Sequence, residues 1–202
     1  MLKITVMVSG GGTNLQAIID GIESGLIEDA EIVKVISSNS KAFSLERAKK
    51  HKIDSIVIGK ENYPSQKERT KAIIKALGDA DTDIVVLAGY MSILEADLIE
   101  AYRGRIINIH PSLIPNFCGP GFYGKHVHEA VLKSGVKETG ATVHYVDEGV
   151  DTGPIILQES VPVLEGDTVE KLAARVLITE HKILCEGIKK VVESMLTYEG
   201  GK

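Results

Sequence analysis

An Asn and a His two residues apart carry the clearest chemical signal in the sequence. Asn108 and His110 lie in the segment Asn108-Ile109-His110-Pro111, at the end of an expected strand, so their side chains can point to the same side of it. Such a histidine can act as a general acid or base near neutral pH, and an amide NH₂ can donate to a developing oxyanion. The same spacing fits a structural histidine and a turn asparagine, so the pair alone indicates only generic acid–base chemistry.

An acidic turn at residues 146–154 is the second candidate, between two apolar extended segments. Asp and Gly are the usual residues of solvated turns, and Asp147 and Glu148 fit that description. A carboxylate beside His110 would favour the imidazolium and fix its orientation, which makes Asp151 the candidate partner. The spacing in sequence does not show that these two side chains meet.

A glycine-rich turn separates the first expected strand from the first expected helix: Ser9-Gly10-Gly11-Gly12-Thr13-Asn14. Glycines let the backbone approach a ligand, and a helix N-terminus favours an anion, so the turn predicts a phosphate site. Thr13 and Asn14 are also natural helix caps. A dinucleotide is disfavoured, because position 15 is Leu and the second strand ends without an acid for a ribose. A connection without any ligand also fits this turn.

Glu180 is an acid on the apolar stripe of a long C-terminal helix, four residues from both Val176 and Leu184. A buried carboxylate needs partners, so Glu180 either pairs internally or binds a polar ligand. His126 and His128 diverge on their expected helix, and no cluster of His, Cys and acids has zinc spacing, so no metal is expected.

His144 and the two cysteines carry weaker signals. His144 alternates with apolar residues in an expected strand, and it either lines the same cleft or lies on an ordinary polar face. Cys118 has no base near it in sequence, which argues against a nucleophilic role. Cys118 and Cys185 lack CxxC spacing and are typical of reduced thiols. Without a signal peptide or an apolar span, the sequence predicts a cytoplasmic protein.

Composition and periodicity define the framework for these residues. The chain has 202 residues, 44% of them hydrophobic and 25% charged, which is enough for one generous core. A net charge of −5 argues against a dedicated nucleic-acid binder but permits a local basic pocket. We expect one domain, 1–202, with sub-regions 1–100 and 101–202.

Short β-rich runs alternate with helical patterns, which predicts an α/β fold with a Rossmann-like, mostly parallel sheet flanked by helices. The expected strands are 4–8, 32–36, 55–58, 84–88 and 106–109, with helices at 14–24, 43–50 and 67–77. After a Pro- and Gly-rich loop at 111–124 come a helix at 126–132, extended segments at 141–146 and 154–163, and a long helix from about 169 to 195. The second half therefore adds a mixed extension to the sheet.

Taken together, these residues resemble the phosphoribosylglycinamide formyltransferases, a family of folate-dependent enzymes. The resemblance runs through nearly the whole chain, at 9–17, 38–39, 87–94, 108–115, 140–144, 151–156 and 180–181. The Asn-x-His-Pro-Ser-Leu-x-Pro portion is shared by the wider superfamily of formyl-folate hydrolases and transferases.

The resemblance implies 10-formyltetrahydrofolate as the donor and the amine of 5-phosphoribosylglycinamide as the acceptor, in de novo purine biosynthesis. It implies that Gly12, Thr13 and Asn14 hold the acceptor phosphate and that Glu180 contacts the ribose. The implied donor site consists of Met91, Ser92, Ile93, Leu94, Asn108, Asp147, Glu148, Gly149, Val150 and Asp151. The implied chemistry is direct amine attack, with Asn108 and protonated His110 stabilising the oxyanion and Asp151 supporting the imidazolium. No metal or covalent enzyme intermediate is required.

The chain departs from the family pattern at three places. Ser92 stands where many members carry Arg, and Gln66 lies near an Arg that others place for the folate tail. The loop at 117–124 is longer than in some bacterial members.

Three alternatives remain open: a formyltetrahydrofolate deformylase, the catalytic part of a methionyl-tRNA formyltransferase, and a nucleotide-binding module without catalysis. The first would be expected to carry an extra N-terminal domain and the second a C-terminal extension. The third leaves Asn108, His110 and Glu180 unexplained. We expect small-molecule substrates rather than nucleic acid or membrane, and a monomer or a homodimer.

Overall fold

One sheet of seven strands organises residues 1–199, which are the residues that the computed structural model describes. The strands are β1 (Leu2–Val8), β2 (Ala30–Ser37), β3 (Ser55–Val57), β4 (Ile84–Leu87), β5 (Ile106–His110), β6 (Glu138–Tyr145) and β7 (Ile155–Pro162). Their order is β3-β2-β1-β4-β5-β6-β7; the first five run parallel, and β6 and β7 join antiparallel. The expected α/β fold with a mixed C-terminal extension is confirmed.

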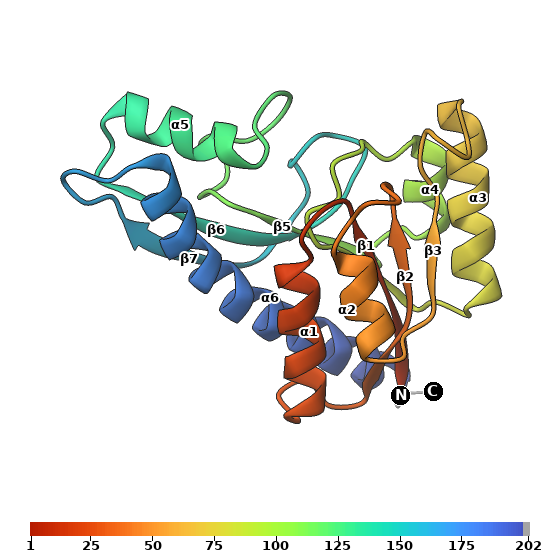
Figure 1. Ribbon diagram of the computed structural model, residues 1–202. Helices are drawn as coiled ribbons and strands as arrows, with labels where there is room; N and C mark the ends of the chain where they lie inside the picture. The colour runs from red at the N-terminus through yellow and green to blue at the C-terminus, as the bar shows by residue number, and fades with distance from the viewer. Residues whose placement is uncertain (200–202) are drawn as a thin grey trace.

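Helices cover both faces of this sheet. They are α1 (Thr13–Glu23), α2 (Ser44–Lys50), α3 (Gln66–Asp79), α4 (Ala96–Ala101), α5 (Lys125–Ser134) and α6 (Val169–Glu199). In Figure 1, α3 and α4 lie on the side of the sheet away from α1 and α6. The apolar run of β4 explains this arrangement: Ile84 and Val86 pack in the larger buried cluster with α1, α5 and α6, while Val85 and Leu87 pack in the smaller one with α3 and α4.

The connections of the sheet create a crevice at one edge. From β1 the chain moves outward to β2 and β3, and then returns to β4 on the opposite side of β1. The segments that follow β1 and β4 therefore leave in opposite directions, which is where open α/β sheets bind ligands. The glycine turn follows β1, residues 88–95 follow β4, and the loop at 111–124 follows β5. All three meet at the carboxyl edge of the parallel strands.

The long helix α6 brings its own residues to this crevice. Its buried stripe packs against β6 and β7 and alongside α1. The stripe consists of Leu172, Val176, Ile183, Leu184, Ile188 and Val191. Glu180 lies on the same stripe, as its spacing predicts.

Three details differ from the sequence-based expectations. Helix α4 was not expected, because six residues are too few to show a helical period. Strand β5 continues to His110, so the histidine itself belongs to the sheet. The N-cap of α1 is Gly12 with φ 71° and no side-chain cap bond, so the prediction that Thr13 and Asn14 cap this helix was wrong.

None of the helices in residues 1–199 is long and apolar enough to cross a membrane.

Candidate functional site

A cleft of about 450 Å³ opens where β1, β4 and β5 end. Thirteen of the fifteen residues expected at the site line it: Asn14, Met91, Ser92, Ile93, Leu94, Asn108, His110, Asp147, Glu148, Gly149, Val150, Asp151 and Glu180. The other two are Gly12 and Thr13, and Thr13 lines a neighbouring groove between α1, α2 and α6. The structure thus brings most of the expected residues into one space.

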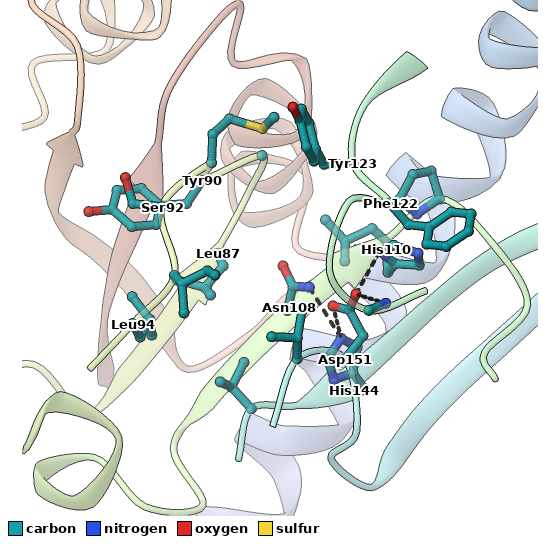
Figure 2. A pocket seen from close by; sticks show the side chains of 18 of the residues that line it. Leu87, Tyr90, Ser92, Leu94, Asn108, His110, Phe122, Tyr123, His144 and Asp151 are labelled. Carbon is teal, nitrogen blue, oxygen red and sulfur yellow. Dashed lines mark hydrogen bonds and ion pairs between the residues drawn. The ribbon is translucent and has the colours of Figure 1, made fainter. Parts of the chain in front are cut away.

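Strand β5 positions Asn108 and His110 at the centre of the cleft. Ile107 and Ile109 point into the larger core cluster, so the alternating side chains of Asn108 and His110 point the other way. His110 is buried and Asn108 partly buried. Figure 2 shows both side chains directed into the cleft. The expectation that Asn108 and His110 point to the same side of the strand is therefore confirmed.

His110 lies between a carbonyl group and a carboxylate. Its Nε2 is 2.9 Å from the carbonyl O of Phe117, which can only accept, so Nε2 carries a proton. Its Nδ1 is 3.6 Å from Oδ2 of Asp151. When Nδ1 also takes a proton, the resulting imidazolium faces a carboxylate that is itself only 12% exposed. The proximity of His110 and Asp151, which the sequence could not show, is present in the structure.

The turn between β6 and β7 holds Asp151 in place. Asp151 has φ 57°, an uncommon value for a residue with a side chain, and its Oδ2 accepts from the N–H of Gly119 at 3.0 Å. Asp147 accepts from Gly149 and Thr152 within the turn, and Glu148 forms an ion pair with Arg103. These two carboxylates stabilise the turn, while the carboxylate of Asp151 faces the two histidines of the cleft.

His144 is the second histidine beside Asp151. It lies opposite Asn108 in the antiparallel pairing of β5 and β6, and its Nε2 is 3.2 Å from Nδ2 of Asn108. Its Nε2 is also 3.7 Å from Oδ1 of Asp151, and its Nδ1 is 2.8 Å from the carbonyl O of Tyr145. Burial lowers the pKa of His144, although the Tyr145 carbonyl and Asp151 act in the opposite direction. Of the two readings that the sequence left open, the structure supports a cleft residue.

A polar pair forms the end of the cleft beside α1 and α6. Nδ2 of Asn14 donates to Oε2 of Glu180 at 3.0 Å, and within residues 1–199 the buried Oδ1 of Asn14 has no hydrogen-bond partner. Burial raises the pKa of the Glu180 carboxyl, and the bond from Asn14 lowers it by less. Glu180 therefore pairs internally, which is one of the two options from the sequence, and it also lines the cleft. An unpaired buried oxygen indicates room for a ligand donor.

His128 is a cleft residue that sequence reasoning missed. It is 4% exposed, its Nδ1 has no partner within the described residues, and it lines the cleft from α5. Burial lowers the pKa of His128, and the nearby His110 lowers it further. His126 instead forms an exposed pair with Glu129, so the two histidines diverge as expected. The position of His128 three residues before the buried Val131 was the available signal.

Apolar side chains form the opposite end of the cleft, beside α4. The apolar residues there are Leu87, Leu94, Ile99 and Val146. Tyr90 lies among them, and burial raises the pKa of its hydroxyl. Figure 2 shows Leu87 and Leu94 across the cleft from Asp151 and His144. This end suits a flat, largely apolar ring system.

The segment after β4 is hydrogen-bonded to the glycine turn on one side and to α3 on the other. The N–H of Met91 donates to Oγ of Ser9 at 2.9 Å, which joins this segment to the glycine turn. Nε2 of Gln66 donates to the carbonyl O of Ile93 at 2.9 Å, and Arg69 donates to Oε1 of Gln66. The side chain of Gln66 thus supports the backbone of the segment.

Cys118 lies in the loop at 111–124, where burial and the charge of Asp151 raise the pKa of its thiol. This environment disfavours the thiolate and agrees with the expectation that Cys118 is not a nucleophile. Both Cys118 and Cys185 are free thiols. Across residues 1–199, no group of three or more His, Cys, Asp or Glu side chains is arranged to hold a metal ion.

Comparisons with known proteins show a family and several similar chains. Residues 2–188 match the family described as "Formyl transferase". The chain is 46% identical over 180 residues to the "Trifunctional purine biosynthetic protein adenosine-3" of Drosophila pseudoobscura pseudoobscura, covering 89% of the chain but only 13% of that relative. It is 37% identical over 197 residues to "Phosphoribosylglycinamide formyltransferase, chloroplastic" of Arabidopsis thaliana, covering 97% of the chain and 67% of the relative. The solved structure of glycinamide ribonucleotide transformylase 1 from Symbiobacterium toebii is 44% identical, has a TM-score of 0.90, and aligns over 96% of this chain and 89% of that one.

Proposed function

The chain belongs to the formyl transferase family, and on that basis we propose that it transfers a formyl group from 10-formyltetrahydrofolate to the amine of 5-phosphoribosylglycinamide. This would be a step of de novo purine biosynthesis. The names of its relatives and the shape of its cleft both support this activity.

The observation that carries the proposal is the position of His110 between two chemically different ends of one cleft. The end with Leu87 and Leu94 suits the pterin ring of a folate. The end with Asn14 and Glu180 offers a buried amide oxygen and a carboxylate, which suit the hydroxyl groups of a ribose. The carbonyl to be attacked and the attacking amine would meet beside His110.

In the proposed reaction the acceptor amine attacks the formyl carbon directly. The oxygen of the tetrahedral intermediate becomes negative, and the imidazolium of His110 and the NH₂ group of Asn108 stabilise it. The carboxylate of Asp151 lies 3.6 Å from Nδ1 of His110, so it faces the positive ring and holds its orientation. The attacking nitrogen, positively charged after the attack, then loses a proton, and the folate nitrogen takes up a proton as its bond to the formyl carbon breaks. The oxyanion returns to a carbonyl in the formylated acceptor, and tetrahydrofolate is released.

The acceptor phosphate is assigned to the glycine turn. Gly12 and Thr13 begin α1, whose N-terminus presents free N–H groups to an anion. Asn14 continues from this turn to the ribose end of the cleft through its bond to Glu180. The phosphate would therefore lie just beyond the ribose, which accounts for Gly12 and Thr13 standing outside the lining of the main cleft.

An assay of the purified protein with 10-formyltetrahydrofolate, with and without 5-phosphoribosylglycinamide, tests the proposal. We expect tetrahydrofolate to form only when the acceptor is present, in equal amount to the formylated acceptor. Formate released at a rate that ignores the acceptor would replace the proposal with the deformylase alternative. The trifunctional relatives extend far beyond the matched region, so further activities of such proteins are not proposed for this chain.

A further inference from the structure

Helix α2 contacts the backbone of the glycine turn at two consecutive carbonyl groups. The N–H of Ser44 donates to the carbonyl O of Gly10 at 3.1 Å. Nε of Arg47 donates to the carbonyl O of Gly11 at 2.8 Å. No other side chain of the described residues bonds to either oxygen, so α2 fixes the orientation of both peptide groups.

These two bonds determine where the amide hydrogens of the turn point. In a trans peptide the C=O and the N–H of one unit point in opposite directions. Because the Gly10 and Gly11 carbonyls point toward α2, the N–H groups of Gly11 and Gly12 point away from it. In residues 1–199 these two N–H groups, and those of Thr13 and Asn14, donate to no protein acceptor. Four donors are thus left on the side of the turn where α1 begins.

A second observation indicates that this side of the turn binds a ligand. The buried Oδ1 of Asn14 has no hydrogen-bond partner among the described residues, and Asn14 lines the main cleft. Gly12 has φ 71°, and a Cβ there would lie 2.6 Å from Cβ of Ser44. The turn is therefore packed tightly against α2 on one face and open on the other.

We propose that Arg47 is a positioning residue for the acceptor phosphate. It acts through the carbonyl of Gly11, which it holds so that the N–H of Gly12 is preset toward the phosphate. The inference rests on the proposed function and adds a residue on α2, outside the main cleft. Arg47 need not touch the phosphate for this role.

The side chain of Arg47 is itself fixed at several points. Nη1 donates to Oε1 of Gln16 at 3.2 Å, and the guanidinium lies 5.2 Å from the ring centre of Phe43. Nε2 of Gln16 donates to Asp20 and contacts His51, so its Oε1 is held toward Arg47. The planar guanidinium bonds Gly11 with one nitrogen and Gln16 with another. A lysine ammonium has only one nitrogen and cannot make both bonds in this geometry.

Arg47→Met and Arg47→Lys, with Lys50→Met as a control, test the proposal. Lys50 is exposed at the end of the same helix, so its loss removes one positive charge from α2 without removing a bond to the turn. Steady-state kinetics with both substrates would be measured for all three variants. We expect both Arg47 variants to raise the KM for the acceptor, Arg47→Met by about tenfold, which corresponds to roughly one hydrogen bond to a charged group. The donor KM and kcat should change less than about twofold, and Lys50→Met should resemble wild type.

A binding measurement without catalysis separates this inference from the proposed function. Inorganic phosphate and ribose 5-phosphate would be titrated into ¹⁵N-labelled protein while the amide signals of Gly11 and Gly12 are followed. We expect saturable shifts in wild type and a dissociation constant about tenfold higher in Arg47→Met.

If wild type responds and Arg47→Met binds equally well, only the role of Arg47 is overturned. Wild-type kinetics in Arg47→Lys, or an equal loss in Lys50→Met, would show a simple charge effect and also overturn it. No response in wild type would remove the phosphate assignment together with this inference.

Discussion

The amide of Asn108 is oriented by the ring of His144. The Tyr145 carbonyl can only accept, so Nδ1 of His144, 2.8 Å away, carries the ring proton. Burial lowers the pKa of His144, which favours the neutral ring, and with the proton on Nδ1 its Nε2 acts as an acceptor. Nδ2 of Asn108 therefore donates to Nε2 at 3.2 Å, and its second N–H remains for the oxyanion.

Replacing His144 is expected to reduce turnover through Asn108. In His144→Leu the amide loses its acceptor and can rotate, so kcat should fall about tenfold to a hundredfold, since removing an oxyanion donor outright costs about 10²–10³. In His144→Gln, Oε1 can accept from Asn108, so this variant should retain more activity. Steady-state kinetics at pH 7.5 provides the measurement.

The two His144 variants also control for each other. Both remove the imidazole, and thermal unfolding would report any general loss of structure. Equal kcat values for the Leu and Gln variants would mean that the acceptor function of Nε2 is irrelevant, and that His144 does not position Asn108.

Asp151→Asn is expected to lower kcat by about 10² or more, within the range of general acid–base contributions. Its side-chain oxygen can still accept from the N–H of Gly119, so the loop position is kept while the charge beside His110 is lost. His110→Ala should have at least as large an effect. Turnover and circular dichroism would be measured together, and near-normal turnover in both variants would refute the catalytic assignment.

Most of the fold could be predicted from the sequence, because the period of the apolar residues determines it. The run Ile84–Leu87 is buried on both faces, and the stripe of α6 recurs every three or four residues, so both elements were found near their true limits. Helix α4 could not be found, because its six residues contain only two buried positions, Leu98 and Ile99. Short elements depend on contacts with distant parts of the chain, which periodicity does not report.

The site could be predicted in part. Residue type and strand-end position were enough to select Asn108, His110 and Asp151, but their contacts depend on the pairing of β5 with β6 and on the turn that follows. His128 and Arg47 were not selected for a role. Both lie on helices outside β5, and only packing brings His128 to the cleft and Arg47 to the glycine turn.

Glu180→Gln is expected to weaken acceptor binding while stabilising the protein at neutral pH. Burial raises the pKa of the Glu180 carboxyl above its ordinary value of 4.5, so the folded protein holds this proton more tightly than the unfolded chain. The free energy of unfolding of wild type should therefore fall relative to Glu180→Gln as the pH rises above about 4.5. Urea unfolding of both proteins between pH 4 and 8 would measure the difference.

The acceptor KM of Glu180→Gln should rise about tenfold, the effect of about one hydrogen bond between a ribose hydroxyl and a charged group. The donor KM should be unchanged. An unchanged dissociation constant for the acceptor would contradict the ribose role, whatever the result for stability.

Gly153→Ala is expected to disturb the carboxylate and the histidine together. A Cβ at Gly153 would lie 1.8 Å from the carbonyl O of Tyr145, the same oxygen that accepts from Nδ1 of His144. Either this carbonyl or the turn that carries Asp151 must move, so kcat should fall at least about tenfold and stability by about 1–3 kcal/mol.

Gly78→Ala is the matched control, since a Cβ there meets no atom within 4 Å and lies in α3. It should keep full activity and unfold at an equal or higher temperature, because alanine favours helix by up to about 1 kcal/mol. Wild-type kcat in Gly153→Ala would mean that the Tyr145 carbonyl does not control the geometry of the site.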